Sequence, residues 1–222
     1  EFVSGAGQWL FDDEGNEYRD FLSGIGVVSV GHCNTRVTAA IQEQTEKLMH
    51  VSNYFYIEHR GEVAERISAM LANGADETWK SFFTNSGAES NEGAIKLARL
   101  WGKKNLHGAY GIVSVERSFH GRTLATLAAT AQDNKQDPFA PLPAGFGRTP
   151  LNDIDALVAA LGAEYDGTRV CALMLECIQG ESGVWPCTPE YLQAARAMTR
   201  ERNMLLIVDE VQTGFCRTGT NF

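Results

Sequence analysis

The sequence predicts an α/β fold in which a mainly parallel sheet is covered by helices on both faces. From about residue 81 onward, short runs typical of strands alternate with longer segments of helical period, and this alternation is typical of a parallel sheet. The apolar run Leu205–Val208 has the composition of a buried strand. Polar residues follow three of the predicted strands, and open α/β sheets bind their ligands at the carboxyl ends of the strands.

The N-terminal part predicts a hairpin and two helices. Residues 8–22 alternate apolar and polar side chains around turn signals at 12–16 and 23–24, which predicts a short hairpin. Apolar residues then recur with a helical period over 37–49 and over 58–72.

The rest of the chain predicts the strands of the sheet and the helices that cover it. Thr188 and Pro189 form a favourable helix start, with Thr as the N-cap and Pro in the first turn. Residues 133–150 are rich in proline and glycine and predict an irregular connection. The predicted elements are, in order, strand 81–84, helix 87–103, strand 111–115, helix 123–130, helix 152–162, strand 169–176, helix 189–203 and strand 204–208.

The composition is ordinary for a globular protein and excludes several classes of partner. The 222 residues are 44% hydrophobic and 21% charged, enough for one large domain or about one and a half average ones. The formal charge of −9 argues against nucleic-acid binding, which needs a basic face. No apolar stretch approaches the ~18 residues of a membrane span and no signal peptide opens the chain, so no membrane partner is expected.

The cysteines and the chain ends add two expectations. The five cysteines are odd in number and form no CxxC pair, so we expect neither a zinc site nor a disulfide framework. We expect a cytoplasmic location, where thiols stay reduced. The cysteines are Cys33, Cys171, Cys177, Cys187 and Cys216. The chain begins without Met and stops at Phe222 without a helix cap or polar tail. We therefore expect a piece of a longer protein.

Asp209 is the first candidate binding residue. It directly follows the apolar run 205–208, so its carboxylate lies at the carboxyl edge of the predicted sheet. A buried carboxylate needs a cationic or hydrogen-bonding partner. The protonated ring nitrogen of pyridoxal phosphate (PLP) is one such partner, because its electron-sink chemistry needs an acid side chain opposite it. The alternative is an ordinary strand-end Asp that accepts backbone N–H bonds.

Residues 84–89 predict a phosphate site at the start of a helix. Ser86 and Glu89 have the spacing of a capping box, which starts the helix at Gly87. Glycine lets backbone N–H groups approach a ligand, and a helix N-terminus favours an anion. The alternative is a capped helix that binds nothing. Dinucleotide-binding and Walker A sites are disfavoured because neither glycine pattern is present.

Two further loops follow predicted strands. Phe119 and Arg122 lie after strand 111–115; an aromatic ring can stack on a flat cofactor and an Arg can hold a carboxylate bidentately. His120 between them is a candidate general acid or a residue that satisfies the loop backbone. Glu176 and Glu181 follow the apolar strand run Cys171–Leu175, and their spacing allows either a hydrolytic acid/base pair or an orienting, charge-pairing role.

Together these segments resemble the class III PLP-dependent aminotransferases, which have the fold-type I architecture. The resemblance runs along nearly the whole chain. It is carried, in order, by Gly7–Asp12, Tyr18–Phe21, Gly31-His32, Ser86–Glu92, Phe119–Thr123, Gln179–Glu181 and Asp209–Gly214.

The resemblance implies a role for each candidate residue. Gly87 and Ala88 would donate backbone N–H groups to the cofactor phosphate, and Asp209 would keep the ring nitrogen protonated. Phe119 would stack on one face of the ring and Val211 on the other. Gln212 would hydrogen-bond the phenolic oxygen of the cofactor, and Ser86 and Glu176 would also contact the cofactor. Arg122 would hold the α-carboxylate of the amino donor. Glu181 would pair with a C-terminal Arg and release it to 2-oxoglutarate.

Within the family, His50–Asn53 and Phe21–Ile25 are most similar to members that use N-acetylornithine in arginine biosynthesis. Members that use ornithine tend to carry Tyr at the position of Ile25, where it orients a free α-amino group. The resemblance therefore implies amino transfer from N-acetylornithine to 2-oxoglutarate by a homodimer. Succinyldiaminopimelate, ornithine and 4-aminobutyrate are the alternative donors.

The resemblance also shows where this chain departs from the family. The family usually has Pro at Cys177 and Gly at both Ser182 and Cys216. The lysine that forms a Schiff base with PLP is expected beyond Phe222, so the alternative hypothesis is a catalytically inactive fragment. The implied division is an N-terminal segment over 1–50, with part of a small domain and a linker helix, and an incomplete PLP-binding large domain over 51–222.

Overall fold

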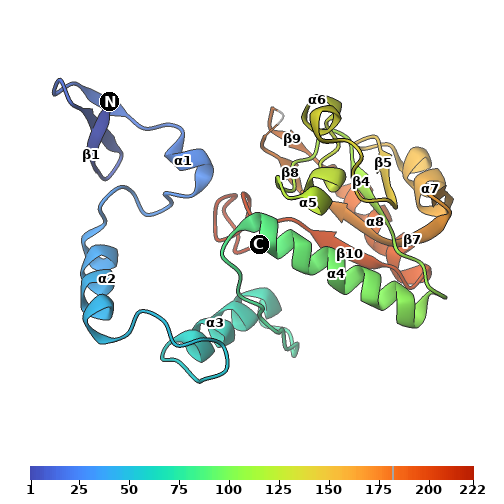
Figure 1. The fold of residues 1–222 in the computed structure, drawn as a ribbon, viewed down its shortest axis with the longest axis horizontal. Helices are drawn as coiled ribbons and strands as arrows, with labels where there is room; N and C mark the ends of the chain where they lie inside the picture. The colour runs from blue at the N-terminus through green and yellow to red at the C-terminus, as the bar shows by residue number, and fades with distance from the viewer. Residues whose placement is uncertain (182) are drawn as a thin grey trace. The chain divides into compact units, whose positions relative to one another are not determined.

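The computed structural model describes residues 1–181 and 183–222 (Figure 1). Ser182, one of the departures from the family pattern, lies outside the described residues. Contacts divide the chain into two compact units, one formed by residues 1–81 with 215–222 and the other by residues 82–214. The division after residue 50 stays a prediction.

The first unit begins with a three-stranded antiparallel sheet. Strands β2 (Trp9–Asp12) and β3 (Glu17–Arg19) form the predicted hairpin, and β1 (Phe2–Ala6) pairs with the other edge of β2. The hairpin turn is held by Asp12, whose carboxylate accepts from the backbone N–H groups of Glu14 and Asn16. The pairing of β1 was not predicted.

Three helices complete the first unit. They are α1 (Ser23–Gly26), α2 (Thr35–Lys47) and α3 (Arg60–Ala72). The predicted helices over 37–49 and 58–72 are confirmed as α2 and α3, and each helix end lies within two residues of the predicted one. Asn34 explains the earlier start of α2, because its side chain caps the helix by accepting from the N–H groups of Arg36 and Val37.

The second unit is built on a parallel sheet with strand order β10-β7-β4-β5. The four strands run parallel to their neighbours and are β4 (Gly111–Val115), β5 (Phe146–Thr149), β7 (Thr168–Leu175) and β10 (Leu205–Val208). A short strand, β6 (Glu164–Tyr165), pairs antiparallel with the start of β7. Parallel neighbours bring their carboxyl ends to one edge.

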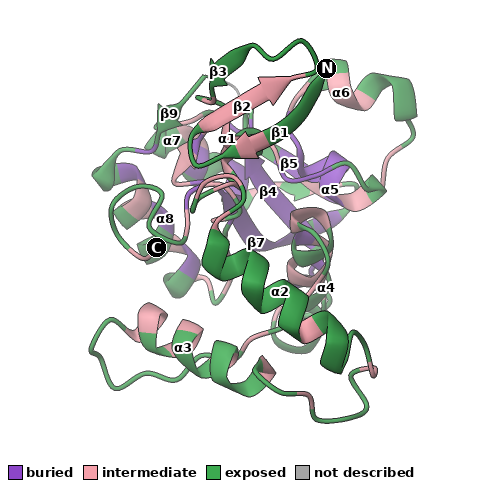
Figure 2. Cartoon of the chain, turned by 90° about the vertical axis from the view of Figure 1, so that its left-hand side faces the viewer, coloured by how far each residue is buried: buried purple, intermediate pink, exposed green. Residues whose placement is uncertain are grey.

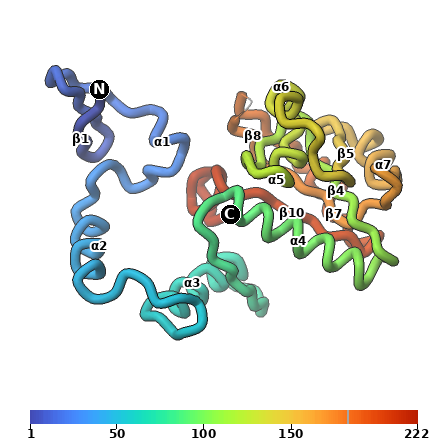
Figure 3. Tube along the Cα trace, in the orientation of Figure 1, coloured from blue at the N-terminus to red at the C-terminus, as the bar shows by residue number. Residues whose placement is uncertain are grey.

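Helices cover both faces of this sheet, as predicted. Alternate residues of β4 and β7 enter two separate apolar clusters. One cluster packs against α4 (Gly87–Asn105) and α5 (Leu124–Ala129), and the other against α7 (Ile154–Gly162) and α8 (Pro189–Glu201). The buried residues, purple in Figure 2, are concentrated in β4, β7 and α5. Figure 3 traces the chain from α4 through β4, α5, α6, β5, α7 and β7 to β10.

Two predictions about this unit are wrong. Residues 81–84 do not form a strand, and Phe82 is 79% exposed, because no strand of the described residues pairs with them. The connection 133–150 is not irregular throughout. It contains α6 (Asp133–Gln136), the short 3-10 helix η1 (Asp137–Phe139) and β5, and β5 forms because β4 offers it an unpaired edge.

A small hairpin follows β7. Strands β8 (Ile178–Gln179) and β9 (Trp185–Pro186) pair antiparallel. This hairpin was not predicted, and it carries Glu181 in its connecting loop. None of the helices in the described part of the chain is long and apolar enough to cross a membrane.

Candidate active site

The carboxyl ends of three adjacent strands meet the N-terminus of α4. Asp209 follows β10, Glu176 follows β7, and the loop 116–123 follows β4. The three predicted strand ends agree with the structure to within one residue, and the structure brings them to one edge of the sheet.

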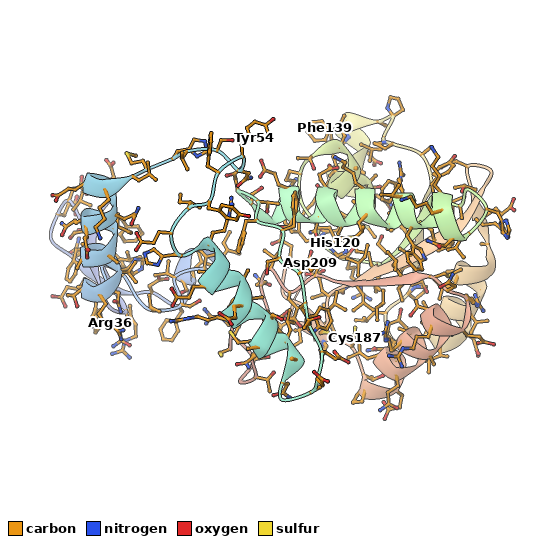
Figure 4. The ribbon with its side chains drawn as sticks, turned by 90° about the horizontal axis from the view of Figure 1, so that it is seen from below. Arg36, Tyr54, His120, Phe139, Cys187 and Asp209 are labelled. Atoms are coloured by element: carbon orange, nitrogen blue, oxygen red, sulfur yellow. The ribbon has the colours of Figure 1, made fainter. Side chains whose placement is uncertain are left out.

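Asp209 is the centre of a buried hydrogen-bond network. It is 7% exposed, and its Oδ2 accepts from Asn91 Nδ2 and from the imidazole of His120, each at 2.8 Å. Its Oδ1 accepts from the Val211 N–H at 3.0 Å. Figure 4 shows His120 and Asp209 next to each other. The network fixes the orientation of the carboxylate at the end of β10.

This environment keeps Asp209 ionised. Burial on its own would raise the pKa of Asp209, but its hydrogen bonds, above all the bond and charge of His120, more than offset burial and the pKa lies below its ordinary value. A carboxylate can accept about four hydrogen bonds, and three are made here. Asp209 therefore retains the capacity to accept one more N–H bond.

The start of α4 presents unbonded backbone donors. Ser86 is the N-cap and its Oγ accepts from the Glu89 N–H at 3.2 Å. Within the described residues no hydrogen bond is formed by the N–H groups of Gly87 and Ala88. These donors, together with the positive end of the helix dipole, suit an anion.

The predicted capping box is only half formed. The Glu89 carboxylate accepts from the backbone N–H of Asn85 at 2.7 Å and from its side chain at 2.9 Å, whereas the box predicts a bond to the Ser86 N–H. The loop before the helix turns so that Asn85, one residue earlier, meets Glu89. The Ser86 N–H is thereby also left without a hydrogen bond in the described residues.

Two glycines allow the loops to approach the helix start closely. A Cβ on Gly87 would lie 2.8 Å from Val211 Cγ1. Gly121 has a φ of +135°, and a Cβ there would lie 2.9 Å from the Cβ of Ala88. The helix start, the loop after β4 and the loop after β10 are therefore in direct contact.

Phe119 is half-buried and has two cations near its ring. The guanidinium of Arg122 lies 5.5 Å from the ring centroid and the Lys135 Nζ lies 5.1 Å from it. Lys135 also forms an ion pair with Glu181 at 2.7 Å. Arg122 is exposed and takes part in no ion pair among the described residues.

Glu176 holds the loop that carries Phe119. Its Oε2 accepts from the Phe119 N–H at 3.0 Å. Burial raises the pKa of Glu176 to about 7, although the Phe119 bond and the charge of His120 act in the opposite direction. These contacts, and the pairing of Glu181 with Lys135, fit the orienting and charge-pairing alternative for the two carboxylates.

Gln212 packs onto the hairpin after β7. A Cβ on Gly180 would lie 1.7 Å from the Gln212 Oε1, so only glycine at position 180 leaves space for this amide. The contact connects the loop after β10 with the loop that leads to Glu181.

The structure adds two residues that the sequence analysis did not single out, and it redefines a third. Asn91 is the polar member of the buried stripe of α4, which otherwise consists of Ile95, Ala98 and Gly102; a polar residue on an apolar stripe was the available signal. His120 was considered only as a general acid or backbone partner, and it bonds to Asp209 instead. Lys135 lies in the short helix α6, in a segment that was predicted to be irregular, and only the fold brings it to Glu181.

The chain is similar to one protein family and to known members of it. The Aminotransferase class-III family matches residues 2–222. Acetylornithine aminotransferase of Caldanaerobacter subterraneus subsp. tengcongensis is 48% identical over 221 residues, which are 99% of this chain and 54% of that protein. The chain thus spans about half the length of the curated relatives it matches.

Solved structures agree in fold over the whole chain. Ornithine aminotransferase from Toxoplasma gondii is 34% identical with a TM-score of 0.89 and covers 100% of this chain and 51% of its own; one of its structures has partial occupancy of PLP at the active site. N-acetylornithine aminotransferase from Stenotrophomonas maltophilia is 34% identical with a TM-score of 0.79, covering 100% of this chain and 53% of its own. The architecture is that of the fold-type I transferases, and the chain belongs to the class III aminotransferases.

Proposed function

We propose that the complete protein is a PLP-dependent transaminase that transfers an amino group from N-acetylornithine to 2-oxoglutarate. The observation that carries this proposal is the buried, ionised Asp209 with one free acceptor position, at the edge where α4 presents its unbonded N–H groups. The names of the acetylornithine aminotransferases among its relatives support the choice of substrate.

The residues present fit PLP. The phosphate needs several donors in one place, and the free N–H groups of Ser86, Gly87 and Ala88 at the start of α4 supply them. The pyridinium N–H needs an acceptor, and Asp209 has one free. Phe119 and Val211 supply apolar surfaces for a flat ring; Val211 is 59% exposed and so remains available for contact. Glu176 and Gln212 complete the set of proposed cofactor-binding residues.

When bound, PLP acts as an electron sink for the bonds broken in amino transfer. The residues of this chain support that chemistry by position and charge. Asp209 would hold a proton on the ring nitrogen, and Asn91 and His120 would keep its carboxylate ionised and oriented. Arg122 would bind the donor's α-carboxylate, and Glu181 would offer its negative charge to an arginine when no second substrate carboxylate is present.

A coupled assay of the complete protein tests this function. With N-acetylornithine and 2-oxoglutarate we expect glutamate formation, together with the visible absorbance band of bound PLP. A protein that binds PLP but produces no glutamate from any of the four candidate donors would contradict the proposed reaction. A protein that shows no absorbance band would contradict the cofactor assignment.

Replacing Gly87 by Val should weaken PLP binding. The new side chain would meet Val211 at the start of α4, where a Cβ already comes to 2.8 Å, so the N–H donors must move. Overpacking of this kind costs about 1–3 kcal/mol, which corresponds to an affinity roughly 5- to 150-fold lower. Titration of apoprotein with PLP measures the effect.

Gly61 provides the matched control. Like Gly87 in α4, Gly61 lies in the first turn of its helix, α3. A Cβ on Gly61 would have no heavy atom within 4 Å. Gly61→Val should leave PLP affinity unchanged. Equal affinities of Gly87→Val and the unsubstituted protein would exclude this helix start as the phosphate site.

The complete protein should prefer N-acetylornithine over ornithine. Ile25 has no hydroxyl group that could receive a free α-amino group, so the charged amine of ornithine would lose hydrogen bonds that it makes in water. Steady-state kinetics with both donors should give the higher kcat/KM for N-acetylornithine. Equal values would leave transamination in place and contradict this choice of donor.

We further propose that the complete protein is a cytoplasmic homodimer that serves arginine biosynthesis. Large apolar side chains of the first unit are highly exposed, among them Met49 at 80% and Tyr54 at 94%, as expected of a surface that a second subunit covers. Analytical ultracentrifugation should give twice the mass of one chain, and a monomer at micromolar concentration would contradict the dimer.

A further inference from the structure

Cys177 and Cys187 oppose each other at the base of the β8–β9 hairpin. In this antiparallel pair Ile178 opposes Pro186 and Gln179 opposes Trp185, and one further step in register places Cys177 opposite Cys187. The Cys187 N–H donates to the Cys177 carbonyl at 2.9 Å, so the pairing extends to this position. Directly opposed residues of an antiparallel pair have their side chains on the same face.

The two thiols share one apolar environment. Cys187 is 8% exposed and belongs to the cluster between the sheet and helices α7 and α8, and the half-buried Cys177 packs against the same cluster. Opposed residues that are joined by backbone hydrogen bonds have Cα atoms about 5.5 Å apart, and disulfides span about 4.4–6.8 Å between Cα atoms. The backbone is therefore already spaced for a disulfide.

We propose that Cys177 and Cys187 form a reversible disulfide when the protein meets a low-molecular-weight disulfide such as oxidised glutathione. The proposal is independent of the proposed function. It concerns an oxidation site that would covalently close the hairpin carrying Glu181.

The reaction balances as two thiol–disulfide exchanges. The Cys177 thiolate attacks one sulfur of oxidised glutathione, which forms a mixed disulfide and releases one glutathione thiolate. The Cys187 thiolate then attacks the Cys177 sulfur and releases the second glutathione. Two protein thiols are oxidised, oxidised glutathione is reduced to two thiols, and the two protein protons pass to the released thiolates through solvent. Cys177 attacks first because it is the more exposed of the pair.

Oxidation would also change a contact of Glu176. The Cys187 Sγ–H donates to the Glu176 carbonyl at 3.3 Å, and a disulfide has no S–H to donate. The same covalent step therefore alters the backbone environment of Glu176 and ties together the two ends of the loop with Glu181.

The rate of oxidation should rise steeply with pH. Burial raises the pKa of both thiols, that of Cys187 to about 12, and only the thiolate attacks a disulfide. Below these pKa values the thiolate fraction grows with pH, so the rate should increase about tenfold between pH 7.5 and pH 8.5.

Peptide mapping of the complete protein tests the proposal. After exposure to oxidised glutathione at pH 8.5, the protein is unfolded in denaturant, its free thiols are alkylated, and it is cut without reduction by a glutamate-specific protease. Cleavage after Glu176, Glu181 and Glu190 places Cys177 in fragment 177–181 and Cys187 in fragment 182–190. Cys171, fully buried on β7, falls in fragment 165–176 and should be alkylated, as the internal control.

We expect fragments 177–181 and 182–190 to be joined by a bond that dithiothreitol cleaves. In Cys187→Ser the reaction should stop at a glutathione adduct on Cys177. If that variant does not fold, the peptide map of the unsubstituted protein still tests whether the disulfide forms. Separate alkylated fragments, a lasting glutathione adduct on Cys177 with Cys187 free, or a bond to Cys171 would each overturn the proposal.

Discussion

Asp209→Ala should reduce transamination by the complete protein on the order of 100- to 1,000-fold in kcat, the usual effect of removing one preorganised electrostatic group. Without the carboxylate nothing in the buried network can stabilise a proton on the ring nitrogen, and a neutral pyridine is a poor electron sink. Steady-state kinetics at saturating PLP measure the loss, and the absorbance of the bound cofactor reports the changed ring environment.

Folding effects must be separated from this loss. Removal of the carboxylate leaves the His120 imidazole and one N–H of the Asn91 amide without an acceptor, which costs about 1–3 kcal/mol of stability. Asp153→Ala is the matched control, because it removes the N-cap carboxylate of α7 and costs about 1 kcal/mol without a role at the proposed site. Thermal unfolding should show both losses, and only Asp209→Ala should lose activity. Activity near that of the unsubstituted protein would disprove the role of Asp209.

Arg122→Lys should lower kcat/KM for N-acetylornithine by about 2–5 kcal/mol, roughly 30- to 5,000-fold, if substrate binding excludes water from the charge pair. The guanidinium presents a planar pair of donors to a carboxylate, and an ammonium group cannot reproduce this bidentate geometry. Arg122 has no ion-pair partner within the described residues, so its donors are available to a substrate.

The loss should appear mainly in KM, because the contact is already made before the reaction begins. Arg36→Lys, an exposed arginine in α2 whose side chain has no bond to another described residue, is the control and should leave both constants unchanged. Equal losses in Arg122→Lys with donors that have and lack an α-carboxylate would show that Arg122 does not bind that group.

The sequence predicted most of the second unit because its signals are local. The apolar run of β10, the strand β4 and the helix starts at Ser86 and Thr188 depend on side chains close in sequence. The strand predicted over 81–84 does not form, because local signals alone are not sufficient for a strand. Its apolar residues favour an extended chain, but a strand also needs a neighbour with free backbone groups, and no such neighbour lies in the described residues.

The candidate site shows the same division between local and long-range information. Strand and helix ends follow from short-range patterns, so the residues next to them, among them Gly87, Phe119 and Asp209, could be named from the sequence alone. The side chains that contact these residues could be identified only in the folded chain. Asn91 lies 118 residues from Asp209, and Lys135 lies 46 residues from Glu181. Such contacts depend on strand order and loop paths, which are set by packing of the whole sheet. No local sequence pattern indicates them.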